Sequence, residues 1–236
     1  MKKTIVIADD FYQHPDAIVD YAKTLKYMCP YNSLADCNSG VPVLWRSSCW
    51  RSARQCPFKS SDRLISRLEF LTGERIDRDH WRENFPVDKN GYPAEGSDTQ
   101  PKSAWWNCTF HAKHRTSQAL GEGVHSHTDR DSWNAVGEDG WAGLIYLSRV
   151  ADRQSGLRTW ENIDAAHTFD WMTPSDNWVL RDTFANVYNR LILHRGGIPH
   201  SGSSGWGNTV DDGRLFQTFF FRILSRPVVR SLELRL

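Results

Sequence analysis

A short motif of histidine and aspartate, followed by a distant histidine, constrains the fold of this chain more than any other feature. His127 and Asp129 are separated by one residue, and His200 follows 71 residues after Asp129. Side chains at positions i and i+2 of an extended strand point to the same side, so His127 and Asp129 can approach one metal ion while Thr128 faces away. A third ligand must then come from a distant strand, and we expect a sheet that brings His200 beside the motif.

The residue types favour one class of metal site. Two imidazoles and one carboxylate can occupy one face of an octahedral Fe(II) ion and leave three positions open for other ligands. His-x-Asp alone is a weak signal, because the same residues also solvate surfaces and cap turns. His125 lies two residues before His127 and shares its expected face, and we assign it by default to a structural or metal-orienting role outside the ligand set.

The segments after the motif occur in an informative order. They are Trp133, an apolar strand at 144–147, a segment at 155–160, a second strand at 187–193, His200, and a strand that begins at Arg214. With the opening stretch at 5–12, this series resembles the 2-oxoglutarate-dependent non-haem Fe(II) dioxygenases, and within them the prolyl-4-hydroxylase-like branch. The resemblance covers about half of the chain, roughly residues 105–225.

The resemblance implies a chemistry and a set of roles. His127, Asp129 and His200 would hold Fe(II), and Arg214 would bind the far carboxylate of 2-oxoglutarate, whose other end chelates the metal. With O2 as oxidant, the reaction would hydroxylate or desaturate an unactivated C–H bond and convert 2-oxoglutarate to succinate. Halogenation is disfavoured because related halogenases replace the carboxylate with Gly or Ala. Trp133 is expected to line the substrate cavity, with a core position as the alternative.

Arg214 has a second interpretation. It begins a strand of Phe and Leu, where a buried guanidinium is costly unless a carboxylate pairs with it. The alternative is an exposed hairpin residue paired with Asp211 or Asp212, since Asp-Asp-Gly before a strand is a hairpin signal. Arg190 and Arg222 are the other cations that could bind the co-substrate.

Periodicity predicts the remaining architecture. Residues 4–8 form an expected strand, Pro15 begins a helix, and a second helix starts near Ser60 or Ser61 and ends at Gly73. Residues 30–58 and 82–102 are expected to be long loops, and a period of two begins at Ala104. We therefore expect an α+β fold in which N-terminal elements within 1–103 buttress a double-stranded β-helix, or jelly roll, at 104–225.

Composition bounds the class of protein. A chain of 236 residues suits a single domain, and a net charge of +1 provides no global field for nucleic acid or an anionic membrane. The apolar run at 4–8 is too short for a signal peptide or a membrane span, so a cytoplasmic location is expected. Oligomeric state leaves no signal in the sequence.

The cysteines and the remaining basic residues carry weaker signals. No Cys-x-x-Cys pair occurs, so reduced thiols are expected, with a structural metal among the first four as the alternative; the cysteines are 29, 37, 49, 56 and 108. The basic residues at 111–115 are interpreted as a solvated loop or as a site for an anionic substrate group. His194 is expected to be a core or rim histidine, and the histidines at 14, 80, 111, 114 and 167 are expected to be solvated.

Three functions from different classes remain open. The first is the 2-oxoglutarate-dependent oxygenase, acting on a small molecule, an amino acid or a peptide-like metabolite. The second is a cupin-type metalloenzyme that does not use 2-oxoglutarate, because His125, His127, an acidic residue and His200 also match that pattern. The third is a non-catalytic jelly-roll binding module, since a fold does not fix a function.

Overall fold

The computed structural model describes residues 2–25, 27–28, 49–82, 107–115, 124–128, 136–163 and 178–227. Seven strands form one sheet, in the order β1 (Ile5–Ala8), β9 (Leu191–Arg195), β6 (Trp141–Tyr146), β11 (Arg214–Phe221), β5 (Thr109–Lys113), β3 (Cys49–Gln55) and β2 (Tyr27–Met28). Three strands form a second sheet, in the order β10 (His200–Ser201), β7 (Arg158–Asn162) and β8 (Trp178–Thr183). The last pair joins β12 (Ile223–Pro227) to β4 (Glu74–Ile76), and the described helices are α1 (Pro15–Lys23), α4 (Asp62–Thr72) and α5 (Arg78–Arg82).

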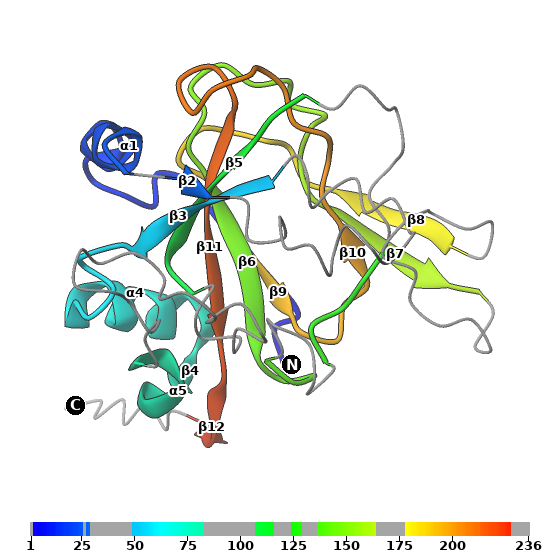
Figure 1. Ribbon diagram of the computed structural model, residues 1–236. Coiled ribbons are helices and arrows are strands. Elements are labelled where there is room, and N and C mark those ends of the chain that lie inside the picture. The colour runs from blue at the N-terminus through cyan, green and yellow to red at the C-terminus, as the bar shows by residue number, and fades with distance from the viewer. Residues whose placement is uncertain are drawn as a thin grey trace, which may run out of the picture.

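The elements are arranged in layers around the seven-stranded sheet, and the strand pairs are antiparallel. Figure 1 shows the helices on one side of this sheet and β7, β8 and β10 on the other. The helix side holds the main apolar core, where Leu215, Phe219 and Phe221 of β11 pack with residues of the helices. Because side chains alternate along a strand, the intervening residues of β11 face the second sheet.

The second helix confirms its prediction from the sequence. Ser61 precedes α4 in an extended conformation, and Gly73 ends it in the left-handed region at φ 79°. Leu64, Ile65 and Leu68 recur at helical spacing and are buried against the sheet. Each buried aliphatic side chain of this kind contributes about 1.5–3 kcal/mol to folding.

Several predicted boundaries are wrong. The stretch predicted as a loop at 30–58 contains strand β3, and the strand predicted at 187–193 begins only at Leu191. Asn189 explains the second difference, because its φ of 62° breaks an extended chain and its side chain instead bonds the backbone of Tyr12. Cys108 has a φ of 61°, so the strand expected from Ala104 begins at Thr109 among the described residues.

The Asp-Asp-Gly segment forms a turn but not a β-hairpin. Asp212 accepts hydrogen bonds from the backbone and hydroxyl of Thr209, and these bonds lower the pKa of Asp212 to about 2. The strand after the turn, β11, pairs with β5 and β6, whereas β10 before it pairs with β7. The turn therefore connects the two sheets.

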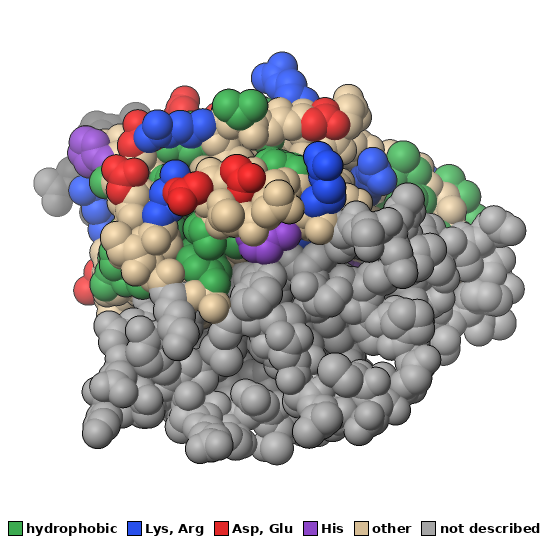
Figure 2. Space-filling model, turned by 45° about the horizontal axis from the view of Figure 1, so that its top comes forward, with side chains coloured by type: hydrophobic (Ala, Val, Ile, Leu, Met, Phe, Trp, Pro, Cys, Tyr) green, Lys and Arg blue, Asp and Glu red, His purple; other side chains and the backbone are tan. Residues whose placement is uncertain are grey.

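Surface features agree with a chain that has little net charge. On the face shown in Figure 2, the acidic and basic side chains of the described residues are interspersed. Among the same described residues, no helix has the length and apolar character required to span a membrane.

A largely buried ion pair joins the two-stranded sheet of β4 and β12 to the large sheet. Arg195 of β9 donates to both carboxylate oxygens of Glu74 in β4, at 2.7 and 2.9 Å, and stacks over Trp141 at 4.0 Å. Trp141 donates its indole N–H to the same carboxylate. Such a bidentate pair leaves a costly buried charge when one partner is removed.

We predict that Glu74→Ala lowers the free energy of unfolding by about 3–5 kcal/mol, because Arg195 stays buried without its carboxylate. Chemical denaturation measures this change. The matched control is Glu161→Ala, whose pair with Arg181 is exposed and should contribute less than about 1 kcal/mol. Equal losses in the two variants would contradict the assignment.

Candidate metal centre

Two backbone hydrogen bonds bring the remote histidines together. His125 and His200 form an isolated antiparallel bridge in which each amide N–H donates to the carbonyl of the other, at 2.9 Å in both directions. Directly opposed residues of an antiparallel pair project their side chains to the same face. The side chain of His127, two residues further on, projects to that face too.

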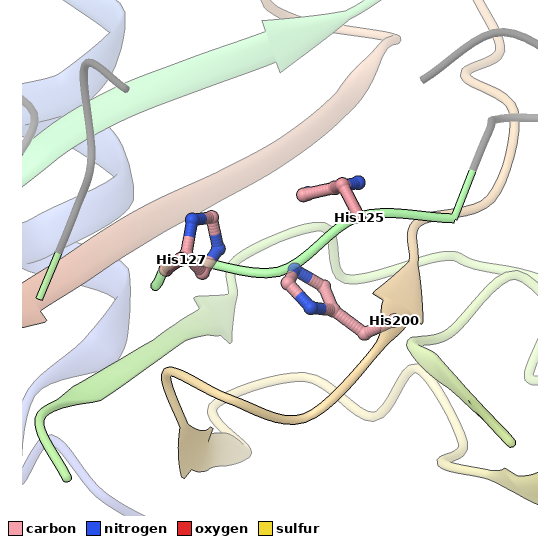
Figure 3. A group of neighbouring side chains, drawn as sticks. All are labelled: His125, His127 and His200. Atoms are coloured by element: carbon pink, nitrogen blue, oxygen red, sulfur yellow. The ribbon is translucent and has the colours of Figure 1, made fainter. Parts of the chain in front are cut away.

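The three imidazoles converge at one point. Figure 3 shows His125 and His127 projecting from one segment and His200 reaching toward them from β10. One nitrogen of each ring lies within 4.8 Å of the other two. The ring centroids of His200 are 4.2 Å from His125 and 4.7 Å from His127. His127 and His200 are buried, whereas His125 is half-buried, so the cluster opens at His125.

The alternation expected around His127 is present. The hydroxyls of Ser126 and Thr128 lie 3.0 Å apart, and they belong to the residues that alternate with His125 and His127. Thr128 thus faces away from the imidazoles, as the sequence predicts. Asp129 and Trp133 lie outside the described residues, so their predicted roles as metal ligand and cavity residue stay predictions.

A hydrogen bond prepares His200 to bind a metal. Its Nδ1 lies 3.0 Å from the carbonyl oxygen of Ile198. A carbonyl only accepts, so Nδ1 carries the proton and Nε2 keeps a lone pair. Burial, reinforced by the neighbouring histidines, holds the pKa of His200 well below its usual range. A neutral imidazole oriented by a backbone carbonyl is the arrangement that metal-binding histidines use, so the residues fit a divalent ion of the first transition series.

His194 supports this cluster from β9. Its ring centroid is 4.1 Å from that of His200 and 5.9 Å from that of His127. Its Nδ1 bonds the carbonyl of Arg195, and burial lowers its pKa to about 4, so its imidazole is neutral. His194 was predicted to be a core or rim histidine, and the structure places it in the core. Spacing alone did not reveal that it packs against the three-histidine cluster.

Close backbone approach holds the histidine segment in place. The amide of His127 donates to the carbonyl of Gly196 at 2.7 Å, and its carbonyl accepts from Val136 and Gly137. A β-carbon on Gly196 would lie 2.1 Å from the carbonyl oxygen of Gly137. Only glycine permits this approach, and a larger residue would push the segment away from its neighbours.

Arg214 is an interior residue. Its side chain is 2% exposed, donates to the carbonyl of Ser203, and stacks near Phe216 with 5.3 Å to the ring centroid. The alternative of an exposed hairpin residue is therefore wrong, and Asp212 bonds Thr209 instead. Of the other two candidate cations, Arg190 pairs with Asp9 and Arg222 is exposed.

The basic stretch at 111–115 is not a solvated loop throughout. Its first three residues belong to β5, in which every residue from Thr109 to Lys113 is buried. His111 bonds the hydroxyls of Thr109 and Thr218 at 3.0 and 3.1 Å. The expectation of solvation is also wrong for His80, which is buried, and is confirmed for His14, which is exposed.

The cysteines whose side chains are described, Cys56 and Cys108, are free and buried. Burial raises the pKa of both thiols, so they stay protonated at neutral pH. The expectation of reduced thiols is confirmed for these two residues. Cys29 and Cys37 lie outside the described residues, and the alternative of a structural metal there stays untested.

No protein-family model matches this chain, and no curated protein matches it by sequence. Similar solved structures include HygX from Streptomyces hygroscopicus with nickel, 2-oxoglutarate and hygromycin B bound, at 10% identity, a TM-score of 0.39, and coverage of 93% of this chain and 83% of that one. HygX with nickel and 2-oxoglutarate bound has a TM-score of 0.40 at the same identity and coverage. EctD from S. alaskensis in its apoform has 11% identity, a TM-score of 0.36, and coverage of 92% and 72%. Similarity at these TM-scores does not indicate a function for this chain.

We predict that His127→Ala and His200→Ala each weaken Co(II) or Ni(II) binding, measured by calorimetry, because each removes an imidazole from the cluster. The loss should exceed the roughly 10- to 100-fold typical of residues that only orient a ligand. The control is His14→Ala, which removes an exposed histidine and should bind like the unmodified chain. Unchanged affinity in both cluster variants would exclude the metal centre.

Proposed function

We propose that the chain is an Fe(II)- and 2-oxoglutarate-dependent oxygenase. The observation that carries the proposal is the presence of two buried imidazoles, of which that of His200 is held neutral, and a buried guanidinium on one face of the large sheet. His127 and His200 supply nitrogen ligands, and Asp129 is the proposed carboxylate ligand. Arg214 supplies the cation for the far end of the co-substrate.

The positions of these groups support a two-ended site. Ser203, whose carbonyl contacts Arg214, follows His200 by three residues, so at most about 11 Å of chain separates the proposed metal ligand from the residue that contacts the guanidinium. A ligand with a chelating group at one end and a carboxylate at the other matches this arrangement. 2-Oxoglutarate has both groups.

The residues of the chain have distinct roles in this reaction. When bound, Fe(II) with O2 supplies the oxidising power that hydroxylates or desaturates a C–H bond while 2-oxoglutarate loses carbon dioxide to give succinate. His200 keeps its metal-binding nitrogen deprotonated through the bond to Ile198. Burial of His127 and His200 keeps their side of the cluster away from solvent. Arg214 positions the co-substrate, because a guanidinium binds a carboxylate with two parallel hydrogen bonds.

We further propose that the two described sheets are the walls of a jelly roll within a single domain. The antiparallel pairing and the placement of the sheets support this fold. The proposed substrate is a small molecule, an amino acid or a peptide-like metabolite, and no nucleic acid or membrane partner is proposed. Assignment to the prolyl-4-hydroxylase-like branch, and a cytoplasmic location, rest on the sequence alone.

A second function is favoured by the position of His125. From the sequence, His125 was predicted to have a role outside the ligand set. In the structure, one of its ring nitrogens belongs to the three-histidine group. A three-histidine centre is a metal site without any contribution from Asp129. A cupin-type metalloenzyme that needs no 2-oxoglutarate would use such a site.

We predict that anaerobic addition of Fe(II) and 2-oxoglutarate produces a visible metal-to-ligand charge-transfer band. The band requires a keto acid chelated to the metal, so His200→Ala should abolish it. Titration of 2-oxoglutarate at fixed Fe(II) gives the affinity. Metal binding without this band would favour the cupin-type function, and absence of metal binding would favour the non-catalytic module.

The two candidate ligand sets predict opposite rankings of two variants. If Asp129 completes the set, Asp129→Ala should weaken Ni(II) binding in the absence of keto acid more than His125→Ala does. If the three histidines form the set, His125→Ala should have the larger effect. Calorimetric titration of both variants, with His14→Ala as the control, decides between the two sets.

A further inference from the structure

We propose that Lys113 shares the far carboxylate of 2-oxoglutarate with Arg214, so that two cations rather than one hold the tail of the co-substrate. This inference rests on the proposed function. It assigns to Lys113 a binding role that neither the metal motif nor the position of Arg214 provides.

The two cations converge on one oxygen atom. Lys113 Nζ donates to the carbonyl of Ser203 at 3.1 Å, and Nη1 of Arg214 donates to the same carbonyl. Lys113 is 5% exposed and Arg214 is 2% exposed. Both charged ends therefore meet inside the protein.

The register of the sheet explains why they meet. Lys113 of β5 and Arg214 of β11 are directly paired, so their side chains project to the same face. Along this face, Phe216 of β11 pairs with Tyr146 of β6, and the ring of Phe220 lies 5.1 Å from that of His127. The cations and the histidines thus belong to one face of the sheet, opposite the helix side.

The carbonyl that receives both cations is held firmly. The hydroxyl of Ser203 donates to the carbonyl of Gly156 at 2.8 Å, which ties it to the segment before β7. Two residues later, a β-carbon on Gly205 would lie 2.3 Å from the carbonyl oxygen of Lys113. This close packing fixes the end of β5 relative to Ser203 and therefore fixes where the two cations point.

Charge favours a carboxylate at this position. The carbonyl of Ser203 orients both cations toward one point. A carboxylate offers two oxygens with about four lone-pair sites, enough to accept from the guanidinium fork and from an ammonium together. The charge of Lys113 would then strengthen binding of the tail without changing how the other end chelates the metal.

The test compares two keto acids that differ only at the far end. 2-Oxoglutarate carries the far carboxylate, whereas 2-oxobutyrate keeps the chelating head and lacks it. In anaerobic Fe(II) titrations followed by the charge-transfer band, Lys113→Gln should weaken 2-oxoglutarate binding by roughly 10- to 100-fold. Binding of 2-oxobutyrate should not change, and Lys113→Arg should restore most of the lost affinity.

Matched variants separate this role from a structural one. Lys59→Gln removes another buried lysine, on the helix side of the sheet, and should leave both affinities unchanged. Circular dichroism checks each fold, and Lys113→Met replaces Lys113→Gln if the latter fails to fold. Equal losses for both keto acids, or an unchanged affinity for 2-oxoglutarate, would overturn the role of Lys113 while the proposed function stands. Failure of the unmodified chain to bind either keto acid would overturn the proposed function and this inference together.

Discussion

The site depends on the antiparallel bridge between His125 and His200. These residues are far apart in the sequence, and their two mutual backbone hydrogen bonds place both imidazoles on one face. The backbone N–H of His127 donates to the carbonyl of Gly196, and this hydrogen bond likewise positions the imidazole of His127. Because the backbone does this positioning, the side chains keep their ring nitrogens available for a ligand. The cluster is thus preorganised before any metal arrives, which lowers the conformational entropy lost on binding.

Strand β11 separates the main apolar core on one face of the sheet from the histidine cluster on the other. Its odd-numbered apolar residues, such as Phe219, pack into the helix-side core, whereas the even-numbered residues from Arg214 to Phe220 face the site. Burying polar groups on that second face is costly unless they are bonded. The bonds of His111 to Thr109 and Thr218 meet this requirement near the middle of the strand. Burial of the apolar side chains on the helix side offsets the free-energy cost of burying charged residues such as Arg214 on the other face.

The sequence predicts those elements whose signals are local. Helix α4 follows from Ser61, the apolar spacing and Gly73, and β11 follows from its apolar run. The sequence does not predict the turn at Asn189, because a left-handed residue stabilised by a distant backbone leaves no periodic signal. Lys113 was predicted from the sequence to lie in a solvated loop or at a site for an anionic group, whereas the structure buries it in β5. A period of two shows that side chains alternate between two faces, but it does not show whether the polar face is exposed or buried. The contact of His194 with the histidine cluster could not be predicted for a related reason, because it depends on how the strands pair.

Burial also determines what the interior charges can do. In a medium of lower effective dielectric, the field of Lys113 and Arg214 is screened less than it would be at the surface. A divalent ion at the histidine cluster would add positive charge to the same interior, and its repulsion with Lys113 and Arg214 would disfavour occupancy by metal alone. A dianion that spans the two ends reduces this repulsion at both. Metal and diacid should therefore bind with positive coupling, since each lowers the electrostatic cost of the other.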